Sequence, residues 1–240
     1  MIAVMGWRLR WLTPGGAAAA TVVGGCVAWG GGYVGATLLL TFFVSGSFLS
    51  ARNRRRPGAE PGPRTAAQVL ANGGCAAVGA LMAFFTDAGW LLLAGAIAAA
   101  QADTWATEIG VNARAQPRLI TTLTQVPAGT SGGITLLGTV GGVAGAGVSA
   151  GIAGFMDLPW AATATLVAGV TAMALDSVLG ATAQARFRCP TCGTVSERRR
   201  HGCGSTGQAV RGLSHLNNDG VNFLATAAGG LTAALWGPGL

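Results

Sequence analysis

The chain has 240 residues, of which 51% are hydrophobic and only 10% are charged. Soluble domains carry roughly 25% charged residues, so the composition excludes an ordinary soluble fold and indicates a single integral membrane domain over residues 1–240. The net charge of +7 comes entirely from arginine, because lysine is absent, and this excludes catalysis by a P-loop lysine or a kinase-type lysine.

The chain begins with a short basic amphipathic segment, residues 1–13, in which two tryptophans lie beside arginines as in an interfacial anchor. It lacks a credible signal cleavage site, so we expect it to remain in the mature protein. Apolar runs that can cross about 30 Å of hydrocarbon follow, separated by glycine-rich or charged breaks. The seven predicted spans are residues 15–29, 33–49, 65–85, 89–109, 133–155, 160–183 and 213–236. The first span is short, so a re-entrant segment is the alternative there.

All fifteen arginines lie in four segments, whereas the alternate turns contain none. The arginine-bearing segments are residues 8–10, 52–64, 114–118 and 186–211, and the arginine-free turns are residues 30–32, 86–88 and 156–159. With the N-terminus in the cytoplasm, seven spans place every arginine on the cytoplasmic side, as the positive-inside rule requires. We therefore expect an all-α polytopic protein of a prokaryotic cytoplasmic membrane, with the bilayer and not nucleic acid as its partner.

Four carboxylates lie at the predicted cytoplasmic ends of the spans. Asp103 and Glu108 follow the uncharged run 89–100, Asp176 lies near the end of the sixth span, and Asp219 begins the last. A carboxylate at membrane depth is costly unless it faces a polar cavity, a partner or a metal, and clustered oxygen ligands suit Mg²⁺. Asp103 and Glu108 diverge by about 140° on an ideal helix, so both reach one metal only if the helix ends or distorts. The alternative is a helix that surfaces here with both acids solvated.

A glycine-rich stretch, residues 127–135 (PAGTSGGIT), precedes the fifth span. Its backbone amides and hydroxyls can bind phosphate at a helix N-terminus, although a glycine-rich loop alone is weak evidence in this chain. Arginines would hold phosphates, and amide side chains would orient the ligand. The predicted substrate- and phosphate-binding residues are Arg52, Arg64, Asn72, Arg118, Gly129, Thr130, Ser131, Gly132, Gln184, Asn218 and Asn222. The alternative is a set of polar helix ends that share no cavity.

The basic segment 186–211 contains a possible metal site. Cys189 and Cys192 form a CPTC knuckle, and His201 and Cys203 follow about ten residues later. Two such pairs match a four-ligand structural zinc site. A cytoplasmic location argues against a disulfide framework, so zinc is predicted, with free or redox-active thiols as the alternative.

Six stretches of the chain resemble, in this order, a family of integral membrane proteins. They are SGSFLSAR, RTAAQVLANG, ADTWATEIG, PRLITTLTQVPAGTSGGIT, DSVLGATAQ and NNDGVNF. The family is domain of unknown function ninety-two, also called the transmembrane protein nineteen family, and it includes plant phytyl-phosphate kinases. The resemblance implies a polytopic membrane protein and, from the plant branch, transfer of a phosphoryl group from a nucleoside triphosphate to an isoprenyl monophosphate. This chain has arginine where the family's basic loop often has lysine, including residues 54–56, which changes the donor geometry.

We therefore expect a prenyl-phosphate kinase-like enzyme in which Asp103, Glu108, Asp176 and Asp219 hold catalytic Mg²⁺. A nucleotidyl transferase or phosphatase acting on lipid phosphates is one rival. A transporter or flippase of anionic lipids is another, but it needs polar residues on both faces, and the arginine-free side offers little besides Asp87 and Asp157. A non-catalytic lipid-binding scaffold is the third.

Overall fold

The computed structural model describes residues 2–54, 62–158, 160–197 and 199–236. Arg55 and Arg56, part of the basic loop in the family resemblance, lie outside the described residues. The helices are α1 (Ile2–Arg8), α2 (Pro14–Gly30), α3 (Gly32–Asn53), α4 (Ala66–Met82), α5 (Asp87–Gly110), α6 (Leu136–Ala153), α7 (Ala161–Thr182) and α8 (Asn218–Leu235). The strands are β1 (Arg118–Leu119), β2 (Gly133–Ile134), β3 (Arg186–Arg188), β4 (Val195–Ser196) and β5 (Gln208–Arg211).

Each predicted span corresponds to one of the helices α2 to α8, and α1 is the basic lead segment. In the described part of the chain, α3, α6 and α7 are long and apolar enough to cross a membrane, and α4 is a shorter apolar helix. The chain is thus mostly helical with three candidate spans, and the count of seven and the side of the N-terminus stay predictions.

Side-chain caps explain where several helices begin. Thr13, Thr65, Thr135 and Asn217 each accept a hydrogen bond from the backbone N–H three residues further on. Such a cap satisfies a backbone donor that the first turn leaves unpaired and is worth about 1 kcal/mol. The break between α2 and α3 falls in the predicted glycine run, where Gly32 has φ +50°, a value that favours glycine.

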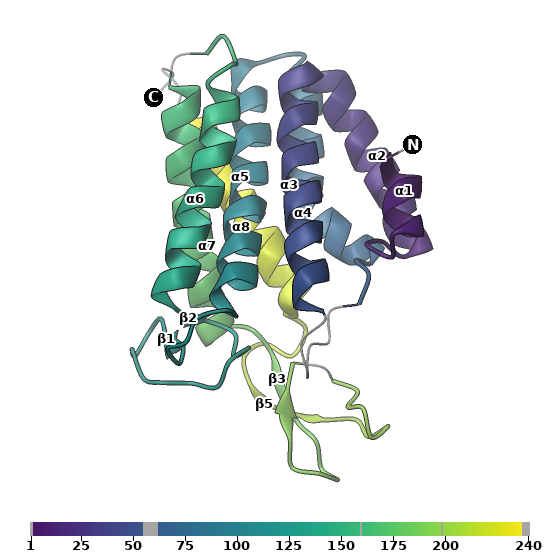
Figure 1. Ribbon diagram of the computed structural model, residues 1–240, viewed down its shortest axis with the longest axis vertical. Helices are drawn as coiled ribbons and strands as arrows, with labels where there is room; N and C mark the ends of the chain where they lie inside the picture. Colours follow the sequence, from purple (N-terminus) through teal and green to yellow (C-terminus); the bar gives the residue numbers. More distant parts are fainter. Residues whose placement is uncertain (1, 55–61, 159, 198, 237–240) are drawn as a thin grey trace.

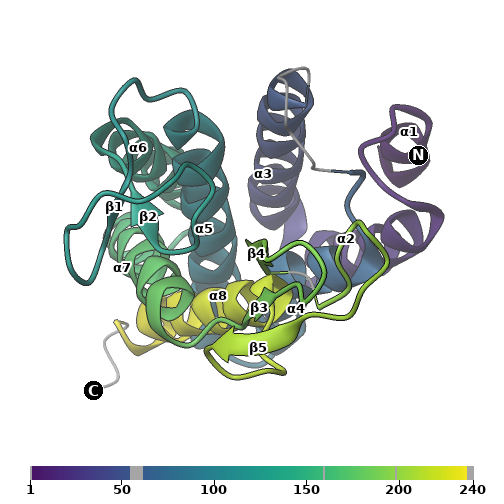
Figure 2. The same ribbon diagram turned by 90° about the horizontal axis from the view of Figure 1, so that it is seen from below.

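Helix α5 is the centre of the bundle, and it packs against α3, α4, α6, α7 and α8 (Figures 1 and 2). Small residues allow this close packing: a Cβ at Gly95 would lie 2.5 Å from the carbonyl oxygen of Gly229 on α8. On the other side, α2 packs against α3 and α4, whereas α3 has few contacts with α4. The α1–α4 half is therefore looser than the half around α5.

The short strands correct the all-α expectation. β1 pairs with β2, and β3 lies between β4 and β5, all antiparallel. The strands lie at one end of the bundle together with the arginine-bearing connections, and the arginine-free turns lie at the opposite end (Figure 1). Segments of two to four residues are too short for hydrophobic periodicity to reveal.

Candidate functional site

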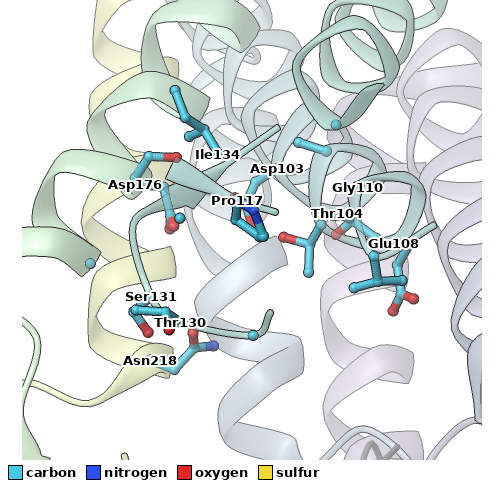
Figure 3. Close-up of a pocket in the computed structure, with 18 of the residues that line it drawn as sticks. Asp103, Thr104, Glu108, Gly110, Pro117, Thr130, Ser131, Ile134, Asp176 and Asn218 are labelled. Atoms are coloured by element: carbon cyan, nitrogen blue, oxygen red, sulfur yellow. The ribbon is translucent and has the colours of Figure 1, made fainter. Parts of the chain in front are cut away.

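A polar cavity of about 970 Å³ opens at the strand-bearing end of the bundle. Its lining comes from α3 to α8, from the glycine-rich stretch before α6, and from Glu197 beyond β4 (Figure 3). This volume is at the upper end of the range typical of ligand pockets. The polar helix ends identified in the sequence therefore do share a cavity.

Asp103 on α5 and Asp176 on α7 face one another inside this cavity (Figure 3). Both are half-buried, and their carboxyl groups lie close enough for their charges to influence each other. The Oδ2 atom of Asp176 is buried and has no hydrogen-bond partner among the residues that the structure describes. Two carboxylates this close repel each other unless a cation or a proton lies between them. The two helices therefore bring together a carboxylate pair that can hold a cation or share a proton.

Glu108 also lines the cavity, but it faces α3 instead of Asp176 (Figure 3). Ser50 donates a hydrogen bond to its Oε1 atom, and the Asn53 amide donates to its Oε2 atom at 2.7 Å and to its backbone oxygen at 2.7 Å. α5 remains helical through Gly110, so the condition for Asp103 and Glu108 to share one metal is not met. Glu108 ties the ends of α3 and α5 together.

The glycine-rich stretch lies against α7 at the mouth of the cavity. Gly129 and Gly132 have φ +80° and +77°, which favour glycine, and a Cβ at Gly132 would lie 2.5 Å from the Cβ atom of Ala181. Ser131 donates a hydrogen bond to the Glu197 carboxylate. The loop is thus held between α7 and the Cys/His segment, with Thr130 and Ser131 in the lining.

Of the three arginines predicted to bind phosphate, Arg64 lines the cavity. Its guanidinium enters the space beside Gly46, where a Cβ would lie 2.9 Å from Nη2. Burial lowers the pKa of the Arg64 guanidinium, and the Glu108 carboxylate opposes that shift, so the group keeps its charge at neutral pH. Arg52 and Arg118 are exposed and lie outside the lining, where Arg54 and Arg114 are found instead.

The predicted amide residues all reach the cavity: Asn72, Gln184, Asn218 and Asn222 belong to its lining. Gln184 is only 1% exposed, and none of the described residues forms a hydrogen bond with its Nε2 atom. Asp219 is outside the lining, because it is rotated by about 100° from Asn218 on α8, whereas Asn222 shares the face of Asn218. The structure therefore brings together two of the four predicted acids as a pair, Asp103 and Asp176.

Cys189, Cys192, His201 and Cys203 form a compact cluster whose ligand atoms all lie within 4.8 Å of one another. Gly193 and Gly204 follow two of the cysteines with φ +72° and +88°, which turns the chain back towards each ligand pair. A hydrogen bond with His201 lowers the pKa of the Cys203 thiol to about 6, so the thiolate form that binds metals prevails at neutral pH. The donor set could hold a metal ion.

Comparison with known proteins supports the resemblance seen in the motifs. Residues 1–230 match the family described as integral membrane protein DUF92. The chain belongs to this family. It is 32% identical over 224 residues to Protein PGR of Arabidopsis thaliana, covering 78% of this chain and 76% of that protein. It is 30% identical over 241 residues to the uncharacterized membrane protein MJ0933 of Methanocaldococcus jannaschii, covering 98% and 90%. No solved structure matches it.

Two features of this DUF92 protein's cavity were not predicted. Glu197 lies in the basic segment, where an acid between arginines reads as a surface residue, yet it reaches the glycine-rich loop. Ser47 lies in the last two turns of α3, but its burial to 2% exposure depends on tertiary packing, and its hydroxyl has no hydrogen-bond partner among the described residues. No signal in the sequence marked Glu197 as part of the site, whereas Ser47 lies in the stretch SGSFLSAR that carries the family resemblance.

Proposed function

We propose that this DUF92 protein transfers a phosphoryl group from a nucleoside triphosphate to an isoprenyl monophosphate, giving the diphosphate. The observation that carries the proposal is the single cavity in which Asp103, Asp176, Arg64 and the glycine-rich loop meet. Each part has a separate task in phosphoryl transfer: charge neutralisation, phosphate binding and placement of the reactants in line. The phytyl-phosphate kinases of the plant branch supply the expected substrate class.

Asp103 and Asp176 fit Mg²⁺, which proteins usually hold through one or two carboxylates together with substrate phosphates. The unpaired Oδ2 atom of Asp176 is a free ligand position. When bound, Mg²⁺ would neutralise charge on the transferring phosphates. The Cys189, Cys192, His201 and Cys203 cluster fits Zn²⁺ equally well, and there we assign a structural role, because four protein ligands leave no open position for substrate.

The remaining residues position the reactants. Arg64 and the amides of the glycine-rich loop bind phosphate oxygens, while Asn218 and Asn222 orient the ligand from α8. An oxygen of the substrate monophosphate attacks the γ-phosphorus, and the bond from that phosphorus to the β,γ-bridging oxygen breaks, leaving a nucleoside diphosphate. The nucleophile is already an anion at neutral pH, so no strong base is required.

The cavity is expected to open to the cytoplasm, where nucleoside triphosphates are available. The arginine-bearing connections lie at this end of the bundle, and the positive-inside rule places them in the cytoplasm (Figure 1). Single cysteines introduced at Gly62 and at Asp87 should be labelled from opposite sides of the membrane. Labelling of both from the same side would contradict this orientation.

Purified protein incubated with Mg²⁺, a nucleotide panel and prenyl monophosphates tests the activity directly, with products identified by mass spectrometry. Formation of the prenyl diphosphate and a nucleoside diphosphate is the expected result. Release of pyrophosphate would instead identify a nucleotidyl transferase, and release of inorganic phosphate from the monophosphate would identify a phosphatase. Absence of any turnover across the panel would remove the kinase proposal.

A further inference from the structure

A second, apolar groove of about 320 Å³ lies in the looser half of the bundle. Its walls come from α1, α2, α3 and α4, and they include Val23 and Gly24 on α2, Leu39 and Phe43 on α3, and Val69 on α4. The groove lies where α3 and α4 have few contacts, and Figure 2 shows these two helices apart when viewed from the strand-bearing end. Along α2 it runs from Ala20 to Ala28, a length of roughly 12 Å.

The groove joins the polar cavity at three residues. Arg64, Gln68 and Asn72 line both spaces. Gln68 and Asn72 lie on one face of α4, four residues apart, and the Asn72 amide donates a hydrogen bond to the backbone oxygen of Gln68 at 2.9 Å. The polar cavity and the apolar groove thus adjoin at one cation and two amide side chains.

Arg64 has contacts suited to the head of an amphipathic ligand. Its guanidinium carbon lies 5.5 Å from the ring centroid of Phe42, and Phe42 lines the apolar groove. The aromatic ring covers the apolar side of the cation, and the guanidinium also belongs to the lining of the polar cavity. If the phosphate group of a lipid binds to Arg64, the first part of its apolar tail would therefore lie beside Phe42.

We propose that this groove binds the isoprenyl tail of the lipid monophosphate, with its phosphate at Arg64, and that the lipid enters sideways from the bilayer between α3 and α4. The inference rests on the proposed function for its substrate class. The shared residues place the phosphate of the occupant beside the carboxylate-bearing cavity, and the proposed function makes that occupant a phosphorylated isoprenoid.

Two adjacent glycines on α2 provide a matched pair of variants. Gly24 lines the groove, whereas Gly25 is exposed and does not line it. A Cβ at either position would have no heavy atom within 4 Å, so both accept a larger side chain. Gly24→Leu fills the groove, while Gly25→Leu adds the same side chain to the same helix outside the groove.

The experiment uses geranylgeranyl monophosphate with a photoreactive diazirine at the tail end, added to the full-length protein in detergent without nucleotide. The expected result is labelling of peptides from α2, α3 and α4 that falls by about tenfold or more in Gly24→Leu and is unchanged in Gly25→Leu. If Gly24→Leu does not accumulate as folded protein, Ala36→Leu on the α3 wall of the groove is used in its place.

Labelling spread over the lipid-facing helices, absence of labelling, or equal labelling of the two leucine variants would overturn the groove assignment. The readout requires no turnover, so it separates the two proposals. A wild-type protein that is labelled in the groove but makes no diphosphate contradicts the kinase and retains the tail site. A protein that makes diphosphate while Gly24→Leu is labelled like wild type contradicts the tail site alone.

Discussion

Two acidic side chains of the same helix, five residues apart, have opposite surroundings. Glu108 is held by Ser50 and Asn53 of α3, which satisfy both of its carboxylate oxygens. Asp103 faces Asp176 of α7, whose buried Oδ2 atom has no hydrogen-bond partner in the part of the chain that the structure describes. A satisfied buried group stabilises the fold, whereas an unsatisfied one has a free energy cost that a ligand can offset. Of these two acids, we therefore assign a structural role to Glu108 on the α3 side of α5 and cation binding to Asp103 on the α7 side.

The largest effect is expected from Asp103→Asn, which keeps the shape of the side chain and removes its charge. Phosphoryl transfer should fall by about two to three orders of magnitude, because the cation site loses one of its two carboxylates. The prenyl diphosphate formed per minute is the measurement, and Asp176→Asn should have the same effect. Normal turnover by either variant with full expression would break the distinction between the two sides of α5.

Loss of the proposed zinc ion tests the role of the Cys/His cluster, which holds the glycine-rich loop against α7. Cys192→Ser should abolish the binding of about one Zn²⁺ per chain, measured by elemental analysis of protein prepared without chelator. Transfer should fall only severalfold, because the cluster acts through the Glu197–Ser131 hydrogen bond and not on the substrate. Wild-type protein without stoichiometric metal would contradict the site.

Glu108→Gln is expected to affect stability more than activity. The glutamine oxygen can accept from Asn53 and its NH2 group can donate to the Ser50 hydroxyl, so both contacts to α3 can persist. Both hydrogen bonds lose the carboxylate charge, and the half-buried Arg64 loses its nearby anion, at a cost of about 1–3 kcal/mol. The apparent midpoint of thermal unfolding in detergent should fall, and transfer by the folded protein should stay within severalfold of wild type. An unchanged midpoint with lost transfer would place Glu108 in the catalytic centre after all.

The smallest effect is expected from Asp219→Asn. The side chain lies one position round α8 from Asn218 and does not line the cavity, so transfer should change by no more than about twofold. Asn218→Ala is the matched comparison, because that residue does line the cavity. A larger loss of phosphoryl transfer from Asp219→Asn than from Asn218→Ala would show that Asp219 belongs to the catalytic site.

Much of this arrangement could be predicted from the sequence. Apolar runs and their glycine or charged breaks located the seven larger helices, and the common level of the helix ends placed Asp103 and Asp176 in one cavity. The helical spacing predicted that Asp103 and Glu108 would diverge, but the helix that each acid faces could not be predicted, because it depends on how α3 and α7 pack against α5. The role of Glu197 and the short strands depends likewise on contacts between distant segments, which no local pattern encodes.

Mn²⁺ binding followed by electron paramagnetic resonance, with Mn²⁺ in place of Mg²⁺, tests the central claim most directly. Wild type and Glu108→Gln should each bind the ion in the presence of a nucleoside triphosphate, whereas Asp103→Asn and Asp176→Asn should bind it at least about tenfold more weakly. Equal binding by all four proteins, or a selective loss in Glu108→Gln, would contradict the assignment of the cation site to the α7 side of α5.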